Sequence, residues 1–99
     1  MQVEFSKIAR QTLHENIEFL NKIWTNREIV IFLEDVKAVA NNLEDGKYEQ
    51  FQKSVRNTRS VLIGKKHVRM FFRKEETKII ILLFFDMRQN SQKIFDLLK

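Results

Sequence analysis

The stretch IIILLFFDMRQN, residues 79–90, decides the fold of this 99-residue chain. Its first seven residues, Ile79 to Phe85, are all apolar, which is typical of a strand whose two faces are both buried. The run is far shorter than the roughly 20 apolar residues that a membrane-spanning helix needs. We therefore expect an interior β-strand over 78–85, which Asp86 ends.

The residues before this strand have the pattern of a β-hairpin. A first strand is expected over 55–63, and the turn GKK, residues 64–66, leads into a second strand over 67–73. Alternation along the second strand makes one face apolar and the other basic. The apolar face carries Val68, Met70 and Phe72, and the basic face carries His67, Arg69, Phe71 and Arg73.

The first 46 residues have the pattern of a short strand followed by two helices. Gln2 to Phe5 alternates polar and apolar residues, and Ser6 can cap the helix that apolar spacing predicts over 7–24. Residues 25–28, TNRE, match a capping box, so a second helix is expected from there to Gly46, which can take a left-handed conformation. So short a connection predicts an antiparallel helical hairpin.

The residues from Ser91 onward carry apolar side chains at helical spacing. This spacing predicts a short terminal helix, or a segment that docks on a neighbour. The order of elements is then β-α-α-β-β-β-α. We expect a single α+β domain over 1–99, in which the helical hairpin packs on a three- to four-stranded, mainly antiparallel sheet.

The charge of the chain is unevenly distributed. Eighteen Lys and Arg against thirteen Asp and Glu give a net charge of +5. Residues 1–46 carry five basic and eight acidic residues, 5 − 8 = −3, whereas residues 47–99 carry thirteen and five, 13 − 5 = +8. A basic half of this density predicts an anionic partner, either nucleic acid or an acidic protein segment.

Cysteine and histidine usage excludes several kinds of chemistry. The chain has no Cys, which excludes disulfides, thiolate catalysis and Cys-based zinc sites, and its two His are too far apart in sequence to suggest a metal site. The opening MQVEFSKIAR lacks the apolar core of a secretory signal. These features predict a cytoplasmic protein that has no metal, cofactor or membrane segment.

In this order, the elements and several motifs resemble the RelE/ParE superfamily of small bacterial toxins. The motifs are VEFS, NNLEDGK, VRNTRSVLI, GKKHVRMFF and IIILLFFDMRQN, and together they span nearly the whole chain. The last motif is the most specific, because a fully apolar strand running into Asp-x-Arg-Gln-Asn is a frequent ending in the plasmid-stabilisation branch. Ser91 stands where that branch often has Pro.

The resemblance implies the toxin of a type II toxin–antitoxin pair, which inhibits bacterial growth when free. It also implies a cognate antitoxin, a small protein whose acidic or amphipathic tail covers the basic sheet face in a hetero-oligomer. One branch of the superfamily poisons DNA gyrase and the other cleaves messenger RNA at the ribosome. The leading interpretation is a gyrase inhibitor. The alternatives are a metal-independent endoribonuclease and a non-toxic, basic nucleic-acid-binding domain.

Comparison with the ribonuclease branch implies three catalytic candidates. Cleavage through the 2′-hydroxyl needs a base, an acid and cations that stabilise the phosphorane. Arg59 and Arg88 match basic positions of that branch, and His67 is the nearby side chain whose chemistry suits proton transfer. The Tyr or His that these enzymes carry near the C-terminus is matched by Ile94 or Phe95, neither of which can move a proton. This gap favours the gyrase interpretation.

Basic residues crowd the hairpin, and like charges packed together imply a counter-charge on a partner. The residues expected to bind the antitoxin or the target are Arg56, Arg59, Lys65, Lys66, Arg69, Phe71, Arg73 and Arg88. Some of them also have a purely structural interpretation. Arg88 can pair with nearby Asp86, and His67 can be a polar residue at the start of a strand. Phe71 can be a packed aromatic instead of a platform on which bases stack.

Overall fold

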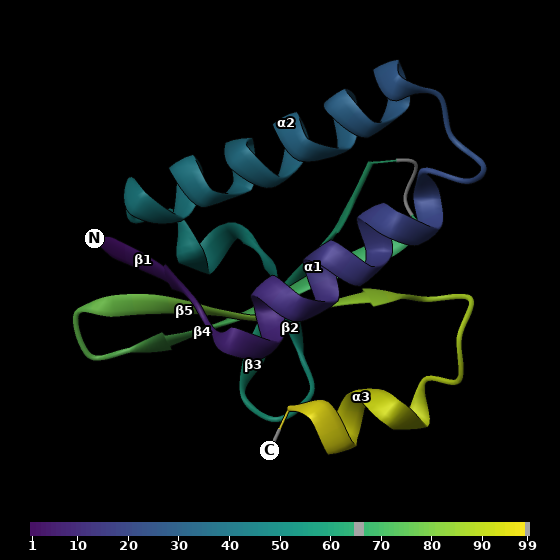
Figure 1. Ribbon diagram of the computed structural model, residues 1–99. Helices are drawn as coiled ribbons and strands as arrows, with labels where there is room; N and C mark the ends of the chain where they lie inside the picture. Colours follow the sequence, from purple (N-terminus) through teal and green to yellow (C-terminus); the bar gives the residue numbers. More distant parts are fainter. Residues whose placement is uncertain (65–66, 99) are drawn as a thin grey trace.

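The computed structural model describes residues 1–64 and 67–98 (Figure 1). Lys65 and Lys66, which belong to the predicted turn and to the expected binding residues, lie outside the described residues. The elements are β1 (Gln2–Phe5), α1 (Lys7–Leu20), α2 (Asn26–Glu44), the 3-10 helix η1 (Tyr48–Gln50), β2 (Gln52–Ser54), β3 (Thr58–Ile63), β4 (Val68–Glu75), β5 (Lys78–Asp86) and α3 (Gln92–Leu97). This order confirms the predicted α+β fold.

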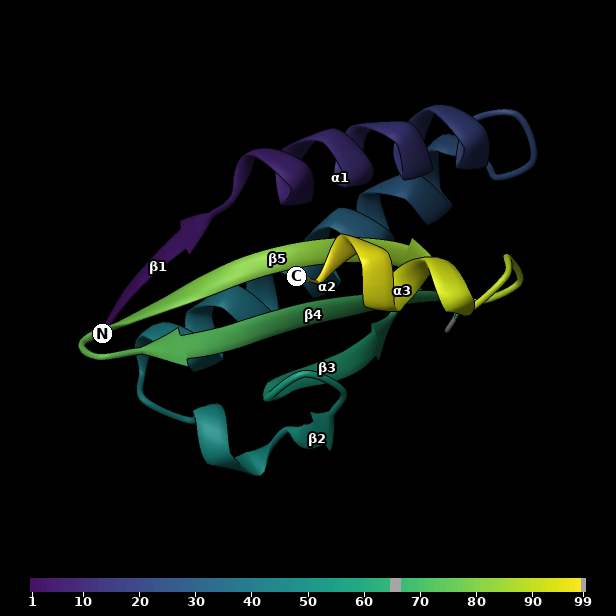
Figure 2. The same ribbon diagram turned by 90° about the horizontal axis from the view of Figure 1, so that it is seen from below.

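The strands form one sheet in the order β1-β5-β4-β3-β2. β1 runs parallel to β5, and the other pairs are antiparallel. The helices α1 and α2 cover one face of the sheet and α3 covers the other (Figures 1 and 2). β5 therefore lies between two strands and two helical layers, which is why both of its faces are apolar.

The helix caps follow the predicted chemistry. The Ser6 hydroxyl accepts from the Ala9 N–H, and Thr25 and Glu28 form the capping box. The expectation that the first helix reaches Trp24 is wrong, because α1 ends at Leu20 and a turn follows. Trp24 still contributes to the apolar packing, because its ring packs edge-on against Phe32, at 5.9 Å between ring centroids.

The sheet has five strands, more than the three or four expected. The expectation of a strand from Val55 is wrong, because β2 already ends at Ser54 and β3 begins at Thr58. Arg56 and Asn57 both have positive φ, 53° and 58°, which makes the tight turn between the two strands. Neither the polar residues of β2 nor an Arg in a left-handed conformation gives a usual sequence signal for a hairpin.

Each face of the sheet has its own apolar core. The predicted alternation along β4 is confirmed, since Val68, Met70 and Phe72 pack under the helical hairpin and Phe71 faces α3. The core under α3 consists of Phe71, Leu83, Phe85, Ile94 and Leu98. Phe71 pairs with Leu83 whereas Phe72 pairs with Ile81, so β5 has a bulge at this point.

Candidate binding surface around Arg69

Arg59 lies on the face of the sheet that the helical hairpin covers. It pairs with Phe72 of the first core, and its side chain is only 14% exposed. Its Nη1 donates to the carbonyls of Glu49 and Phe51, at 3.1 and 2.7 Å, and its Nη2 lies 2.9 Å from Glu49 Oε2. The guanidinium also lies over the Tyr48 ring. All these contacts join β3 to the segment around η1.

Arg88 follows β5 and forms the ion pair with Asp86 that its structural interpretation predicts. Its Nη2 donates to Asp86 Oδ2 at 2.6 Å and its Nε to Oδ1 at 2.9 Å. The side-chain hydrogen bonds from Arg88 lower the pKa of the Asp86 carboxyl, and the same bonds raise the pKa of Arg88. The guanidinium also lies over the Phe19 ring of α1, at 5.7 Å.

The three catalytic candidates do not form one cluster. His67 is exposed and directly precedes β4, where its carbonyl accepts from the Met87 N–H at 2.8 Å. It therefore lies at the same end of the sheet as Arg88. Arg59 pairs with Phe72 at the other half of β4 and on the helical-hairpin face. A ribonuclease site built from all three residues would therefore need one phosphorane to contact both the end of the sheet at His67 and Arg88 and the distant position of Arg59.

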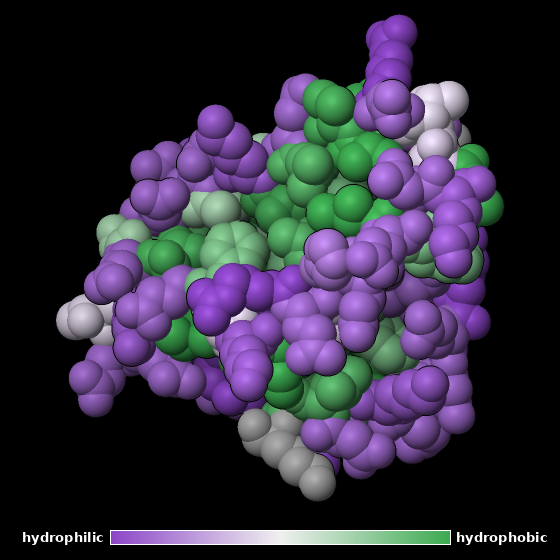
Figure 3. Space-filling model, viewed as in Figure 1, coloured by the Kyte–Doolittle hydropathy of each residue, from purple (hydrophilic) through white to green (hydrophobic). Residues whose placement is uncertain are grey.

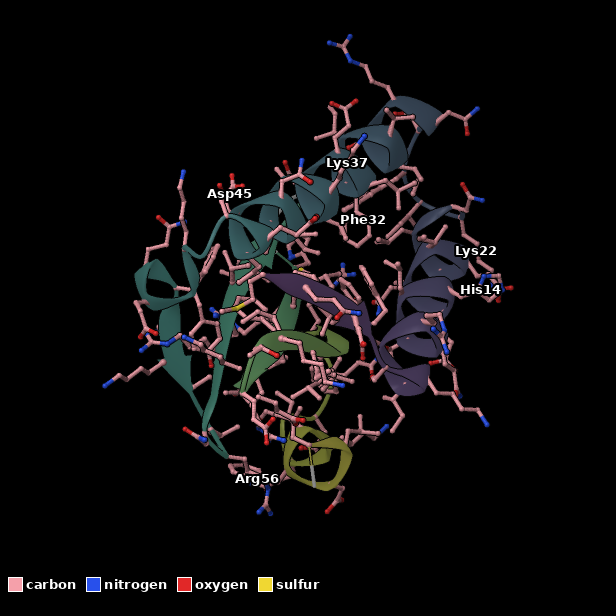
Figure 4. All side chains as sticks on the ribbon, turned by 90° about the vertical axis from the view of Figure 1, so that its left-hand side faces the viewer. His14, Lys22, Phe32, Lys37, Asp45 and Arg56 are labelled. Carbon is pink, nitrogen blue, oxygen red and sulfur yellow. The ribbon has the colours of Figure 1, made fainter. Side chains whose placement is uncertain are left out.

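Arg56 holds the chain's own C-terminal helix, and Arg73 holds the backbone of the turn at Arg56. Arg56 Nε donates to the Phe95 carbonyl at 3.2 Å, and its guanidinium lies over the Phe95 ring at 5.8 Å. Figure 4 shows Arg56 beside α3. Arg73 Nη2 donates to the Arg56 carbonyl at 2.9 Å. Phe71 is 2% exposed under α3. Its ring is therefore a packed aromatic of the sheet and is covered by α3.

Arg69 is the remaining basic residue of the predicted cluster within the described part of the chain. Its side chain is half-buried on β4, and its Nη1 donates to Ser60 Oγ at 2.9 Å. Within residues 1–64 and 67–98, no carboxylate forms an ion pair with it. Arg69 thus keeps a charge that the described residues leave uncompensated.

Two cavities meet at Arg69. One, of about 350 Å³, is lined by Gln50, Phe51, Gln52, Ser60, Val61, Leu62 and Arg69. The other, of about 200 Å³, is lined by Ser54, Val55, Arg69, Phe71, Met87, Ser91, Ile94 and Phe95. We call this combined surface the Arg69 groove. Sequence reasoning missed Ser60 and Leu62 as part of it, although both alternate with core residues along the predicted strand.

A second exposed apolar area lies on the helical hairpin (Figure 3). It includes Ile23, Val30, Ile31 and Leu33, each 40 to 55% exposed. The half-buried carboxylates on α2 have partners within the chain, since Glu28 belongs to the capping box and Asp35 accepts from the Gly64 N–H at 3.0 Å.

Two kinds of site are absent from the described residues. No group of three or more His, Asp or Glu side chains is placed to hold a metal ion within residues 1–64 and 67–98. In the same part of the chain, no helix is long and apolar enough to cross a membrane.

Similarity to a known protein is found at the level of structure. No protein-family model matches the sequence, and no curated protein matches it. A solved structure titled "Chromosomal ParDE TA system from P. aeruginosa" contains a chain that superposes with a TM-score of 0.71 and 14% sequence identity. The superposition covers 87% of this chain and 95% of the other. Together with the order of strands and helices, it shows that this chain has the same fold as that chain of the ParDE system.

Proposed function

We propose that this chain is the toxin of a type II toxin–antitoxin pair. The observation that carries the proposal is the structural likeness to a chain of a ParDE toxin–antitoxin system, which extends over almost the whole length of both chains. The +8 charge of residues 47–99 supports an acidic protein partner, because such a partner neutralises the like charges of the sheet half. In this proposal the free chain inhibits growth and the antitoxin suppresses it.

For the mechanism, we infer binding to gyrase without chemistry on a substrate. The support is the engagement of Arg59 and Arg88 in internal contacts, with which a phosphorane would have to compete for each guanidinium. The segment that would carry a C-terminal proton donor supplies Ile94, which is buried, and Phe95. RNA cleavage is the second candidate, and one observation favours it, namely that His67 and Arg88 lie at the same end of the sheet.

Induction of the chain alone in a bacterial host tests the proposal. Growth, transcript integrity and the DNA-damage response are followed in one culture, and purified chain is added to a gyrase supercoiling assay. We expect growth arrest, intact transcripts and inhibited supercoiling. Normal growth at full expression would refute the toxin role. Arrest with rapid transcript cleavage that Arg88→Ala abolishes would replace the gyrase mechanism by RNA cleavage.

A variant that cannot fold supplies the control. Phe72 is fully buried in the first core, so Phe72→Asp places an unpaired charge there and abolishes folding. Growth arrest by this variant at equal expression would mean that overproduction, and not the folded chain, is harmful.

A further inference from the structure

The outer side of α2 is apolar at its centre. Ile29, Phe32 and Val36 lie on the inner side of the helix and are buried, whereas Val30 and Ile31 remain about half exposed. Figure 1 shows α2 at the outside of the fold, and Figure 4 shows Phe32 on its inner side. Adjacent large apolar side chains on an outer helix indicate a surface that another molecule covers.

Opposite charges flank this apolar centre. Arg27 lies as far before the midpoint between Val30 and Ile31 as Glu34 lies after it, about 5 Å along the helix axis in each case. The helical period places all four side chains on one side of α2. Both charged residues are exposed, and neither forms an ion pair within residues 1–64 and 67–98.

This arrangement is self-complementary. In an isologous dimer, a two-fold axis makes one residue of the first copy contact a second residue of the other copy, and the reverse. An axis between Val30 and Ile31 sets two α2 helices antiparallel and brings these apolar side chains of both copies together. It also places Arg27 of each copy level with Glu34 of the other, so the same ion pair forms twice. Ala38, one turn after Glu34, is small and lets the helices approach.

The distribution of charge favours this side of the molecule for contact between two copies. Residues 47–99 carry +8, so two sheet halves repel each other, whereas residues 1–46 carry −3. On the outer side of α2, the charges of Arg27 and Glu34 balance within each copy. A partner of uniform charge would meet a like charge at one of these two residues, which lowers its affinity.

We propose that two copies of this chain associate through their α2 helices, antiparallel about a two-fold axis between Val30 and Ile31. The proposal does not depend on the toxin role, because it rests on α2 alone. A contact that is one helix wide belongs to the small class of interfaces, so we expect a dimer with a Kd on the order of 10 µM.

Charge reversal tests the pairing on the purified full chain, with sedimentation measured over concentrations that span this Kd. Arg27→Glu and Glu34→Arg each set like charges opposite one another, and we expect either variant alone to raise the Kd at least about tenfold. In an equimolar mixture of the two variants, each facing pair again joins opposite charges. We therefore expect heterodimers with a Kd close to that of the wild type.

Matched controls change the net charge away from the contact. Lys53→Glu, at an exposed position of β2, makes the same change as Arg27→Glu, and Asp45→Lys, about 22 Å from the axis along α2, makes the same change as Glu34→Arg. Neither control should alter the dimer. A mixture that stays monomeric, a dimer that both reversals leave intact, or a wild-type chain that stays monomeric throughout would overturn the proposal.

Cysteine substitution tests the orientation, because the chain has no Cys of its own. Val30→Cys places two thiols beside the axis, and we expect oxidation to link the copies. Asn41→Cys lies on the same side of α2, but the two-fold axis separates its copies by about 30 Å along the helix, too far for a disulfide. Equal crosslinking of both variants would contradict the antiparallel arrangement.

The growth assay separates failure of the dimer from failure of the toxin role. A chain that dimerises as expected but does not arrest growth would refute the toxin role and leave the dimer standing. If the chain is monomeric and Val30→Asp abolishes growth arrest at equal expression, the outer side of α2 contacts the cellular target and the dimer proposal is wrong.

Discussion

Asp86 accepts three hydrogen bonds from Arg88, two from the guanidinium and one from the backbone N–H. The carboxylate is 4% exposed at the end of β5, so it needs a partner of opposite charge. The guanidinium meets this need and packs on Phe19 at the same time. The segment that the sequence marks most clearly as functional thus contains a structural ion pair that ends the central apolar strand.

The Asp86–Arg88 ion pair makes the free energy of unfolding depend on pH in the acidic range. The Arg88 hydrogen bonds hold the native pKa of Asp86 below its ordinary 3.8, so the stabilisation is complete above that value and is lost as pH falls through the lower native pKa. We expect Asp86→Asn to lower the free energy of unfolding by about 1 kcal/mol near neutral pH, a low value because solvent screens the half-exposed guanidinium. In urea denaturation followed by circular dichroism, the gap to wild type should shrink in strong acid. Asp96→Asn, at an exposed position, is the control, and a gap that is constant with pH would contradict this account.

Arg59 should contribute more to stability than to function. Arg59→Gln removes a nearly buried guanidinium from two carbonyls and from Glu49, and we expect a loss of about 2 kcal/mol in the free energy of unfolding. Lys53, its exposed cross-strand partner, is the matched control, and Lys53→Gln should change stability by less than about 0.5 kcal/mol. Thermal denaturation measures both. Loss of toxicity in a stable Arg59→Gln variant would instead indicate a functional role.

The two glycines should differ in how they tolerate a side chain. Both have positive φ, but a Cβ at Gly64 would lie 2.7 Å from Phe32 Cδ1, whereas a Cβ at Gly46 would meet nothing within 4 Å. Gly46→Ala should cost about 1 kcal/mol for the backbone alone, and Gly64→Ala about 3 kcal/mol because Phe32 is fully buried and must move. Midpoints of chemical denaturation compare them, and equal costs would mean that the contact with Phe32 relaxes freely.

The packing of α3 over Phe71 should depend on the buried side chains of that helix. Ile94 is 6% exposed in the second core and Leu97 is 37% exposed, although both belong to the same short helix. We expect Ile94→Ala to cost about 2 kcal/mol and to increase amide hydrogen exchange in α3, and Leu97→Ala to cost well under 1 kcal/mol. If the two variants exchange alike, α3 is not held by the core around Phe71.

Local patterns were sufficient to predict most elements of the fold. Caps such as Ser6 and Thr25 act within a few residues of themselves, and the apolar run from Ile79 needs only its own length to identify a buried strand. The turn at Arg56 and Asn57 escaped prediction because positive φ at these residues is imposed by the pairing of β2 with β3. The candidate site was predicted less well, because a list of basic residues does not say which contacts each one makes.

The sequence by itself determined the α+β order, the two-sided β4 and the concentration of positive charge in the second half. These follow from periodicity and composition, which are properties of neighbouring residues. Only the tertiary structure decided that Arg59 faces the helical hairpin, that Arg56 contacts α3 while Arg73 holds the turn at Arg56, and that Arg69 is left without an acidic partner among the described residues. The reason is that strand register and the docking of α3 bring together residues tens of positions apart, and these contacts decide which charges are compensated within the chain.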